Sequence, residues 1–587
     1  MRRERRGPKP IERLNLVSIS RSVTKAMINS SAALQLAMVT FAFYVVFTIF
    51  KKEPRTYAQA LKREDSAKWV DATNVERKAL EDAGTWEITT LPPDALCIPS
   101  TIVYKIKQDV NGKVQKYKAR LCARGDYQSE GIHYGETYSP VARFATIRMV
   151  VALATIMHWT VWQLDVNSAY LYGTIDRLIY MIIPDGFYPK EKSEGKVLKL
   201  LKSLYGIKQA GRIWYELLRS FLIDRGFINN SLDRCCFVKY IGKSIISVLV
   251  YVDDLIYTSD SLEHLRKFKE DMSSRFQMKD LGELSYMVGL RFHMEKDHTT
   301  VSQELYAGDV LTRFDHQSTH ATKSPLTEST ILYPAEEGDE LADLKRYQSM
   351  VGSIMYLNMG TAPYLSFTIS QLTRHMSKPT LLHLEAAERT LRYIKLTQLE
   401  GLHYRYSGQD DASSRRDSVV LEASSDAEWA GDISDSKSTS GYIIRLAGSP
   451  VMWKSQKQKS VAKSSTAAET AAADSCSEDI IWGRLLLKFL GFEQKQPTVL
   501  FMDNQAAIHG IKNGNTTGRN KYFRVRIDAL HEAYNDRLLD PVYKRSADLT
   551  SDGLTKAVSA PKLLQFKRSN NIFNVEPVNS GQAGVAP

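Results

Sequence analysis

The stretch "SVLVYVDDLIYTSD" (residues 247–260) sets two adjacent carboxylates, Asp253 and Asp254, between two runs of apolar and aromatic side chains. This pattern predicts two β-strands joined by a tight turn at the two acids. Aspartate is common in turns, so turn chemistry alone is one explanation of the pair. Burying carboxylates beside Val, Leu and Tyr is otherwise costly, unless a cation or strong hydrogen-bond donors meet them.

A third acid favours a cation. Asp165 lies near the end of another predicted strand, "TVWQLDV" (160–166), where no turn signal accounts for it. If the two strands are neighbours, the three carboxylates converge at one end of a sheet. Carboxylate clusters of this kind bind divalent cations, and two Mg²⁺ ions about 4 Å apart can activate a 3′-hydroxyl and stabilise a leaving pyrophosphate.

Composition describes a folded protein with a basic surplus. The 587 residues exceed what one core supports, and 43% hydrophobic with 25% charged residues excludes a disordered chain. The net charge is +12, and residues 101–125 carry a dense basic run in a hairpin predicted to turn at Asn111-Gly112. This run fits either a solvated hairpin face or a nucleic-acid contact. The cysteines (97, 122, 235, 236 and 476) show no zinc spacing, which predicts a reduced protein without disulfides.

Four further acids stand out beyond residue 419, each with a simpler explanation beside the functional one. Asp426 and Asp503 end predicted strands, Glu469 lies near the start of a predicted helix, and Asp552 falls in "SDGLTK". Glu469 could complete a capping box that starts at Thr466, and Asp503 could cap the helix that follows it. Together the four could instead bind metal ions. The strand–helix pattern from 419 onward predicts a segment with its own core.

Eight motifs in order over about 53–404 resemble the reverse transcriptases of the Ty1/copia class of LTR retrotransposons. They are "EPRTYAQAL" with "TWEI", "YKARLCARGDYQSEGIHYGETYSPVARFATIR", "WQLDVNSAYLYG", "YMIIPDGF", "SLYGIKQAGRIW", "YVDD" and "MKDLGELSYMVGL". Further on, "DAEWAGDISDSKSTSGYIIRLAGSPVMWKSQKQKSVAKSSTAAET" is similar to the ribonuclease H (RNase H) of the same elements. The resemblance implies an RNA-directed DNA polymerase, a nucleotidyltransferase, joined to an endonuclease that hydrolyses the RNA strand of a hybrid.

The implied fold is mixed α/β (α+β): a right-hand polymerase with fingers, palm and thumb, followed by an RNase H-like domain with a mixed sheet. The expected organisation is a basic leader with an apolar segment (1–52), the polymerase (53–314), a connection (315–418), the RNase H-like domain (419–560) and a tail (561–587), disordered after about 570. The apolar segment, about 26–50, is long enough to span a membrane, or else forms a packed or peripheral helix.

The resemblance also implies roles for individual residues. Asp165 and Asp253 would bridge two Mg²⁺ ions, with Mn²⁺ as a substitute, and Asp254 would support them. Asp426, Glu469, Asp503 and Asp552 would hold two ions in the RNase H-like domain, with Asp548 as a rival to Asp552. Tyr170 would be the steric gate against ribonucleotides, although a core aromatic is the alternative. Expected substrate contacts are Lys107, Lys118 and Arg124 of the basic hairpin, and Gly206, Lys208 and Gln209 of the following loop.

The sequence departs from the family pattern at three places: Gly211 replaces a usual proline, "TAPYLS" (361–366) replaces R-P-D-I, and "NKYFRVRID" (520–528) lacks two usual histidines. The sequence contains no protease motif, zinc knuckle or integrase head, so it resembles the C-terminal part of a polyprotein. Expected partners are an RNA template, a DNA primer, their hybrid, dNTPs, capsid and integrase, in a cytoplasmic particle or the nucleus. Alternatives are a decayed or domesticated copy that binds nucleic acid without catalysis, and a membrane-tethered fusion.

Overall fold

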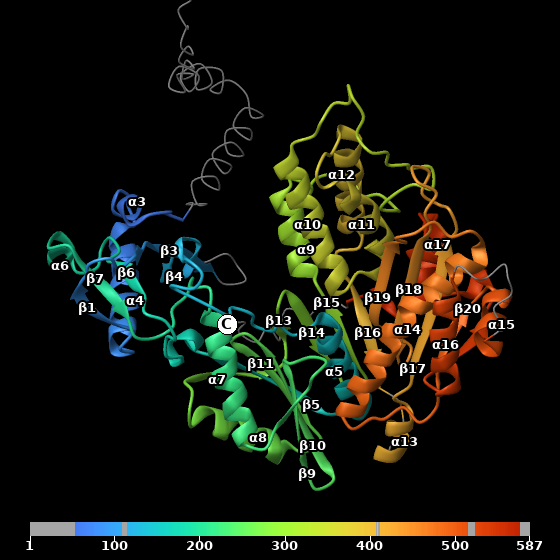
Figure 1. The fold of residues 1–587 in the computed structure, drawn as a ribbon, viewed down its shortest axis with the longest axis horizontal. Coiled ribbons are helices and arrows are strands. Elements are labelled where there is room, and N and C mark those ends of the chain that lie inside the picture. Colours follow the sequence, from blue (N-terminus) through green and yellow to red (C-terminus); the bar gives the residue numbers. More distant parts are fainter. Residues whose placement is uncertain (1–52, 109–113, 407, 409–410, 515–522, 576–587) are drawn as a thin grey trace, which may run out of the picture. The chain divides into compact units, whose positions relative to one another are not determined.

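The computed structural model describes residues 53–108, 114–406, 408, 411–514 and 523–575, which form two compact units. The first unit contains the described residues up to Tyr127 together with Ile179–Lys199. The second contains Gln128–Leu178 and the described residues from Leu200 onward. Helices and strands occur in both units (Figure 1), which confirms the predicted mixed α/β fold class.

The first unit combines a four-stranded sheet, in the order β1-β7-β6-β2, with a separate β3-β4 hairpin. Its elements are α3 (Tyr57–Leu61), α4 (Ser66–Asp82), β1 (Trp86–Thr90), β2 (Cys97–Ile98), β3 (Ser100–Gln108), β4 (Val114–Ala123), β6 (Tyr180–Ile182), α6 (Pro189–Ser193) and β7 (Lys196–Leu200). The antiparallel pairing of β3 with β4 confirms the predicted hairpin, whose predicted turn at 111–112 lies outside the described residues. Buried Trp69 of α4 packs edge-on against Tyr104 and Tyr117, which fixes the helix on the hairpin.

A six-stranded antiparallel sheet lies in the second unit, in the order β12-β5-β11-β10-β9-β8. The strands are β5 (Thr160–Val166), β8 (Ile228–Asn229), β9 (Cys236–Ile241), β10 (Ser244–Tyr251), β11 (Asp254–Ser259) and β12 (Met278–Glu283). Alternate residues of β11 face different cores: Leu255 and Tyr257 pack with α7 (Ala210–Asp224) and α8 (Leu262–Ser273), whereas Ile256 packs with α5 (Phe144–Met157). The antiparallel pairing of β10 with β11 confirms the predicted pair of strands.

A second sheet follows, in the order β13-β14-β15-β16-β22, with helices α9 to α12 from the same region of the chain. Its strands are β13 (Tyr286–Met287), β14 (Leu290–Met294), β15 (His298–Ser302), β16 (Glu400–Arg405) and β22 (Ile572–Asn574). The helices are α9 (Glu304–Arg313), α10 (Leu344–Gly360), α11 (Ser366–Leu372) and α12 (Leu381–Leu396). Residues 315–343 contain no α-helix or strand, as the polar sequence there predicts.

The third sheet of the second unit is mixed, in the order β19-β18-β17-β20-β21. Strand β17 runs antiparallel to β18 and parallel to β20, which in turn runs parallel to β21. Helix α14 lies against β17 and β18, and α16 packs on α14 (Figure 1). The elements are α13 (Ala412–Asp417), β17 (Leu421–Glu428), β18 (Thr439–Leu446), β19 (Ser449–Lys457), α14 (Ser465–Phe489), β20 (Thr498–Met502), α15 (Gln505–Asn513), α16 (Arg524–Asn535), β21 (Leu539–Tyr543) and α17 (Ala560–Ser569).

The expectation of a separate core beyond residue 419 is wrong. One continuous cluster of buried side chains runs from Ile147 of α5 through Leu402 of β16 to Ile443 of β18. Arg148 of α5 also crosses this boundary, because its Nε donates to the Val451 carbonyl (2.9 Å) and its guanidinium stacks on the Trp453 ring at 4.0 Å. The same guanidinium donates to two carbonyls at the end of α10. The six-stranded sheet and the mixed sheet therefore share one core.

The tail expected at 561–587 begins too early. Residues 560–569 form α17. Strand β22 pairs antiparallel with β16, with Leu402 opposite Ile572 and Gly401 opposite Phe573. The apolar segment predicted at about 26–50 lies outside the described residues; within the described ranges, no helix meets the length and hydropathy of a membrane span. All five cysteines are free thiols, as predicted.

Candidate active sites

The first three predicted acids meet at one end of the six-stranded sheet. Strands β5 and β11 are adjacent, and Asp165 lies directly opposite Asp254 in their register. The intervening Asp253 accepts a hydrogen bond at its carbonyl from the amide of Val166, at 2.9 Å. All three acids are partly exposed. The structure thus brings the three carboxylates together at a solvent-accessible rim.

The turn that carries Asp253 is held in an unusual backbone conformation. Val252 has a φ of +59°, a region that β-branched residues rarely adopt. The indole of buried Trp214 in α7 donates to the Val252 carbonyl at 2.7 Å. This hydrogen bond stabilises a backbone conformation whose free-energy cost is typically about 1–3 kcal/mol, and the conformation fixes the position of the acids. Trp214 was not predicted, since it lies on a different element some forty positions earlier.

The surroundings of Asp254 disfavour its charged form. Burial and the neighbouring carboxylates of Asp253 and Asp165 raise the pKa of Asp254 to about 6, although a hydrogen bond from buried Gln163 opposes the shift. Hard oxygen ligands that repel one another in this way are the donor set that Mg²⁺ prefers. The residues therefore fit a divalent cation.

The predicted gate and loop residues lie next to one another in the second unit. Tyr170 lies in a short 3₁₀ helix (Ala169–Tyr172) after β5, and its ring packs edge-on against Tyr205, with centroids 4.7 Å apart. Gly206 follows with a φ of +92°, a conformation that glycine adopts without strain. Tyr170 is partly exposed and also packs against the buried cluster that contains Leu164 and Trp214.

The loop residues Lys208 and Gln209 are anchored differently. The Lys208 ammonium lies over the Tyr134 ring at 4.4 Å and is itself exposed. Gln209 is fully buried, and its amide donates to the carbonyl of His133 (2.9 Å) and to Asp176 (3.3 Å). Gln209 thus holds the loop in place, whereas Lys208 presents a charge to solvent.

The predicted hairpin contacts belong to the first unit. Lys107 is exposed, whereas Lys118 is partly buried, and burial together with the nearby cations of Arg120 and Lys107 lowers its pKa. Arg124 is exposed and pairs with Asp126 through two hydrogen bonds of 2.6 and 2.8 Å. Two of the three cations are therefore exposed on this unit.

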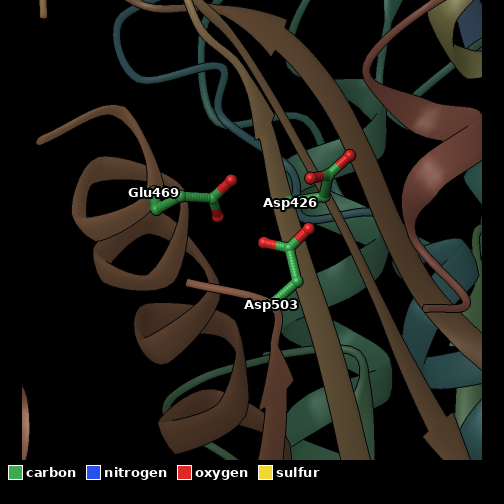
Figure 2. A group of neighbouring side chains, drawn as sticks. All are labelled: Asp426, Glu469 and Asp503. Atoms are coloured by element: carbon green, nitrogen blue, oxygen red, sulfur yellow. The ribbon is translucent and has the colours of Figure 1, made fainter. Parts of the chain in front are cut away.

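A second carboxylate group lies at the mixed sheet. Asp426 on β17, Glu469 on α14 and Asp503 directly after β20 each offer an oxygen within 4.8 Å of the others. Figure 2 shows the three side chains pointing toward one another from these three elements. Among the described residues, no other group of His, Cys, Asp or Glu side chains has its ligand atoms this close together. The carboxylate oxygens of Asp165, Asp253 and Asp254 are therefore more widely spaced.

The simpler explanations of these acids fail. Helix α14 is capped by Ser464, whose side chain accepts from the amide of Ala467, so Glu469 is not part of a capping box. Helix α15 is capped by Asn504 rather than by Asp503. Helix capping therefore does not explain the positions of Glu469 and Asp503.

The second group is buried and strongly self-repelling. Asp426 and Glu469 are 6% and 5% exposed. Glu469 Oε1 accepts from the Ala427 amide at 3.1 Å, whereas its buried Oε2 has no partner. Burial, followed by repulsion from Asp426 and Asp503, raises the pKa of Glu469 far above its ordinary value. An unpartnered carboxylate oxygen facing two other acids fits a divalent cation.

The fourth predicted acid does not join this group. Asp552 pairs with Lys556 at 2.6 Å, and its rival Asp548 pairs with Arg545 at 2.7 Å. Thr555, which was not predicted, donates its hydroxyl to Asp426 at 2.6 Å. Asp552 therefore lies beside the second carboxylate group and is paired with a lysine.

Comparison with known proteins identifies the family of this chain. Residues 83–328 match the family model described as reverse transcriptase (RNA-dependent DNA polymerase). A retrovirus-related Pol polyprotein from the Arabidopsis thaliana transposon RE1 is 35% identical, over 90% of this chain and 35% of that protein. A putative transposon Ty5-1 protein of Saccharomyces cerevisiae is 31% identical, over 51% of this chain and 94% of that protein. The chain belongs to the Ty1/copia-type Pol family.

This member of the Ty1/copia-type Pol family spans about a third of the length of the Pol polyproteins that it matches, 35% and 36% for two from Arabidopsis thaliana. It carries the reverse transcriptase domain of the family. Among solved structures, a foamy viral protease–reverse transcriptase in complex with double-stranded DNA aligns with 92% of this chain and 84% of that chain, at 12% identity and a TM-score of 0.45.

Proposed function

We propose that the chain copies RNA into DNA at Asp165, Asp253 and Asp254, and degrades the RNA strand of the resulting hybrid at Asp426, Glu469 and Asp503. The observation that carries the proposal is the presence of two separate carboxylate groups, each fitted for divalent cations, in a chain of the reverse transcriptase family. A nucleic-acid binder without catalysis would have no need of the unpartnered buried oxygen of Glu469.

In DNA synthesis, the primer 3′-oxygen attacks the α-phosphorus of a dNTP, and the bond to pyrophosphate breaks. Two Mg²⁺ ions, or Mn²⁺, would supply activation of the hydroxyl and neutralisation of the leaving group. Asp165 and Asp253 would hold both ions, and Asp254 would support them from the start of β11. The strained turn at Val252 keeps the acids in position before substrate arrives.

Substrate selection would fall to residues of both units. Tyr170 would exclude the 2′-hydroxyl of ribonucleotides, Gly206 and Lys208 would line the nascent base pair, and buried Gln209 would hold their loop in place. Lys107, Lys118 and Arg124 would contact triphosphate or template through their charges. Expected partners are an RNA template, a DNA primer and dNTPs, with capsid and integrase as other products of the polyprotein, in a cytoplasmic particle or the nucleus.

In RNA cleavage, water attacks a phosphodiester of the RNA strand. Asp426, Glu469 and Asp503 would hold the ions that activate this water, with Asp552 beside them. Thr555 fixes one oxygen of Asp426, and Ser546 donates to Asp503 at 2.5 Å. These hydrogen bonds orient the carboxylates, as second partners of metal ligands do.

One labelled RNA annealed to a DNA primer tests both activities at once. We expect the unaltered chain with Mg²⁺ to extend the primer and to cleave the RNA. Glu469→Gln should keep extension and lose cleavage by at least about a thousandfold, because the side chain keeps its size and loses the charge that binds metal. Glu478→Gln, on an exposed face of the same helix, is the matched control and should retain both activities.

Cleavage that survives in Glu469→Gln would mean that this buried acid has no role in the reaction. A chain that binds the hybrid but neither extends nor cleaves would instead support the alternative of a copy without catalysis.

A further inference from the structure

Lys556 lies beside the second carboxylate group and pairs with the acid that stays outside it. Its ammonium is 2.6 Å from Asp552 Oδ1 and 3.9 Å from Glu428 Oε2. Its chain neighbour Thr555 bonds directly to Asp426. The segment 552–556 thus brings one cation to the edge of a metal-binding group.

The charge of Lys556 reaches the metal-binding acids themselves. Burial acts to lower the pKa of Lys556, but the hydrogen bond and charge of Asp552, together with the charges of Asp426 and Glu428, raise it overall. In turn, the ammonium lowers the pKa of Asp426 and of Glu469, against the larger effect of their burial. Lys556 therefore offsets part of the repulsion that a divalent ion would otherwise remove.

Close packing fixes the segment at this place. Gly441 of β18 lies directly opposite Asp426 in the strand register. A side chain at Gly441 would bring its Cβ to 2.7 Å from Leu554 and 2.8 Å from Thr555. The segment consequently rests on β18 where β18 passes Asp426, and Lys556 cannot be far from that acid.

Asp426 is shared between two environments. With Glu469 and Asp503 it forms a group that fits one divalent ion. Toward Asp552, the other acid that could hold a second ion, the positive charge is already supplied by Lys556. A second divalent ion at Asp426 and Asp552 would have to displace the ammonium, because two cations repel strongly at such distances. The long, flexible lysine stem allows this movement.

We propose that Lys556 is a tethered cation at the Asp426–Asp552 side of this centre. One divalent ion binds at Asp426, Glu469 and Asp503, and a second binds only as the ammonium moves away from Asp552. The inference rests on the proposed RNA cleavage and adds a form of regulation to it. Without substrate, the centre holds one ion tightly and binds the second ion weakly. Lys556 is a positioning residue, since it acts through the acids.

The test counts bound Mn²⁺ in the full chain by electron paramagnetic resonance of the free ion. The background carries Asp253→Asn and Asp254→Asn, which removes the first carboxylate group from the count. We expect one tight and one weak ion. Lys556→Met should tighten the weak ion at least fivefold, whereas Lys556→Arg, which keeps the charge, should leave its affinity unchanged. Lys562→Met, an exposed lysine that lines the same 270 Å³ cavity, is the matched control.

An unchanged weak ion in Lys556→Met overturns the inference, and so does an equal tightening in Lys556→Arg, which would point to bulk rather than charge. Glu469→Gln separates this failure from that of the proposed function. If Glu469→Gln leaves the tight ion bound, the metal-dependent cleavage centre itself is wrong. If Glu469→Gln removes the tight ion while Lys556→Met changes nothing, only the role of Lys556 is wrong.

Discussion

The two carboxylate groups of this chain are built in opposite ways. The first group (Asp165, Asp253 and Asp254) takes two neighbouring acids from one turn and a third from the adjacent strand, and all three remain partly exposed. The second group (Asp426, Glu469 and Asp503) takes one acid from each of three elements, and two of the three are almost fully buried. The first group needs little more than a hairpin and its neighbour, whereas the second exists only when a helix and two strands are assembled.

This difference teaches where each group draws its stability. Burial and the two neighbouring carboxylates raise the pKa of Asp254 in the first group to about 6, and burial raises that of Asp426 in the second group to about 6, whereas burial and repulsion raise the pKa of Glu469 to about 9. In the second group, the surrounding core, which also contains α5 on one side of the six-stranded sheet, holds the repelling acids in place. The buried group therefore depends on packing that the two parts share.

The largest expected effect comes from dividing that core. A chain ending at residue 418 would lose Leu421, Ile443 and the Val451 carbonyl that Arg148 bonds, and it would expose the apolar side of α5. We expect loss of cooperative folding and of primer extension. The free energy lost with this apolar burial would exceed the free energy of unfolding of a typical protein, which is about 5–15 kcal/mol. Circular dichroism during urea unfolding measures this, with a chain ending at residue 575 as control.

A soluble 418-residue chain with normal extension would break the comparison, since the two groups would then rest on separate cores after all.

This outcome also shows what the sequence could predict. The turn at Asp253 and its convergence with Asp165 follow from residues close in sequence and from one strand pairing, so the pattern was enough. The close packing of Thr555 against Gly441 and the hydrogen bond from the Trp214 indole to the Val252 carbonyl depend on contacts between elements that are distant in sequence. Apolar periodicity marks α5 and β18 as buried without saying that they bury against each other, so the separate core was the natural but wrong expectation. β22 was missed because three residues carry almost no pattern.

The next effect tests the exposed group alone. Asp253→Asn should lower dNTP incorporation by at least about a thousandfold, or about 4 kcal/mol, because an amide is a far weaker ligand for Mg²⁺ and empties no volume. RNA cleavage should stay within about twofold, since charge lost at the rim does not disturb the shared core. Steady-state extension and cleavage on one hybrid measure both, and Asp260→Asn, just beyond the far end of β11, is the control. Near-normal incorporation in Asp253→Asn would remove this acid from the reaction.

The smallest effect concerns how the two groups treat one hydroxyl. In our proposal, polymerisation must reject the ribose 2′-hydroxyl of the incoming nucleotide, whereas cleavage must select the strand that carries it. Tyr170 lies close after Asp165 in the chain, with its ring against Tyr205, so it is placed to enforce the first demand. Tyr170→Val should therefore reduce the preference for dNTPs over rNTPs at least about tenfold, or about 1.4 kcal/mol, and leave the choice of strand for cleavage unchanged.

Tyr172→Phe is the matched control for this last prediction. Tyr172 comes two residues later and packs against Phe276, with its hydroxyl on the Gln277 amide, so it points into the core rather than toward substrate. Incorporation of dNTPs and rNTPs by the two variants, measured as kcat/KM on one template, separates a gate from a packing residue. An unchanged preference in Tyr170→Val would assign this ring to packing, and sugar selection would then have to come from the loop at Gly206 and Lys208. A shift in both variants would mean that the segment after β5 moves as a whole, since a gate acts through one ring alone.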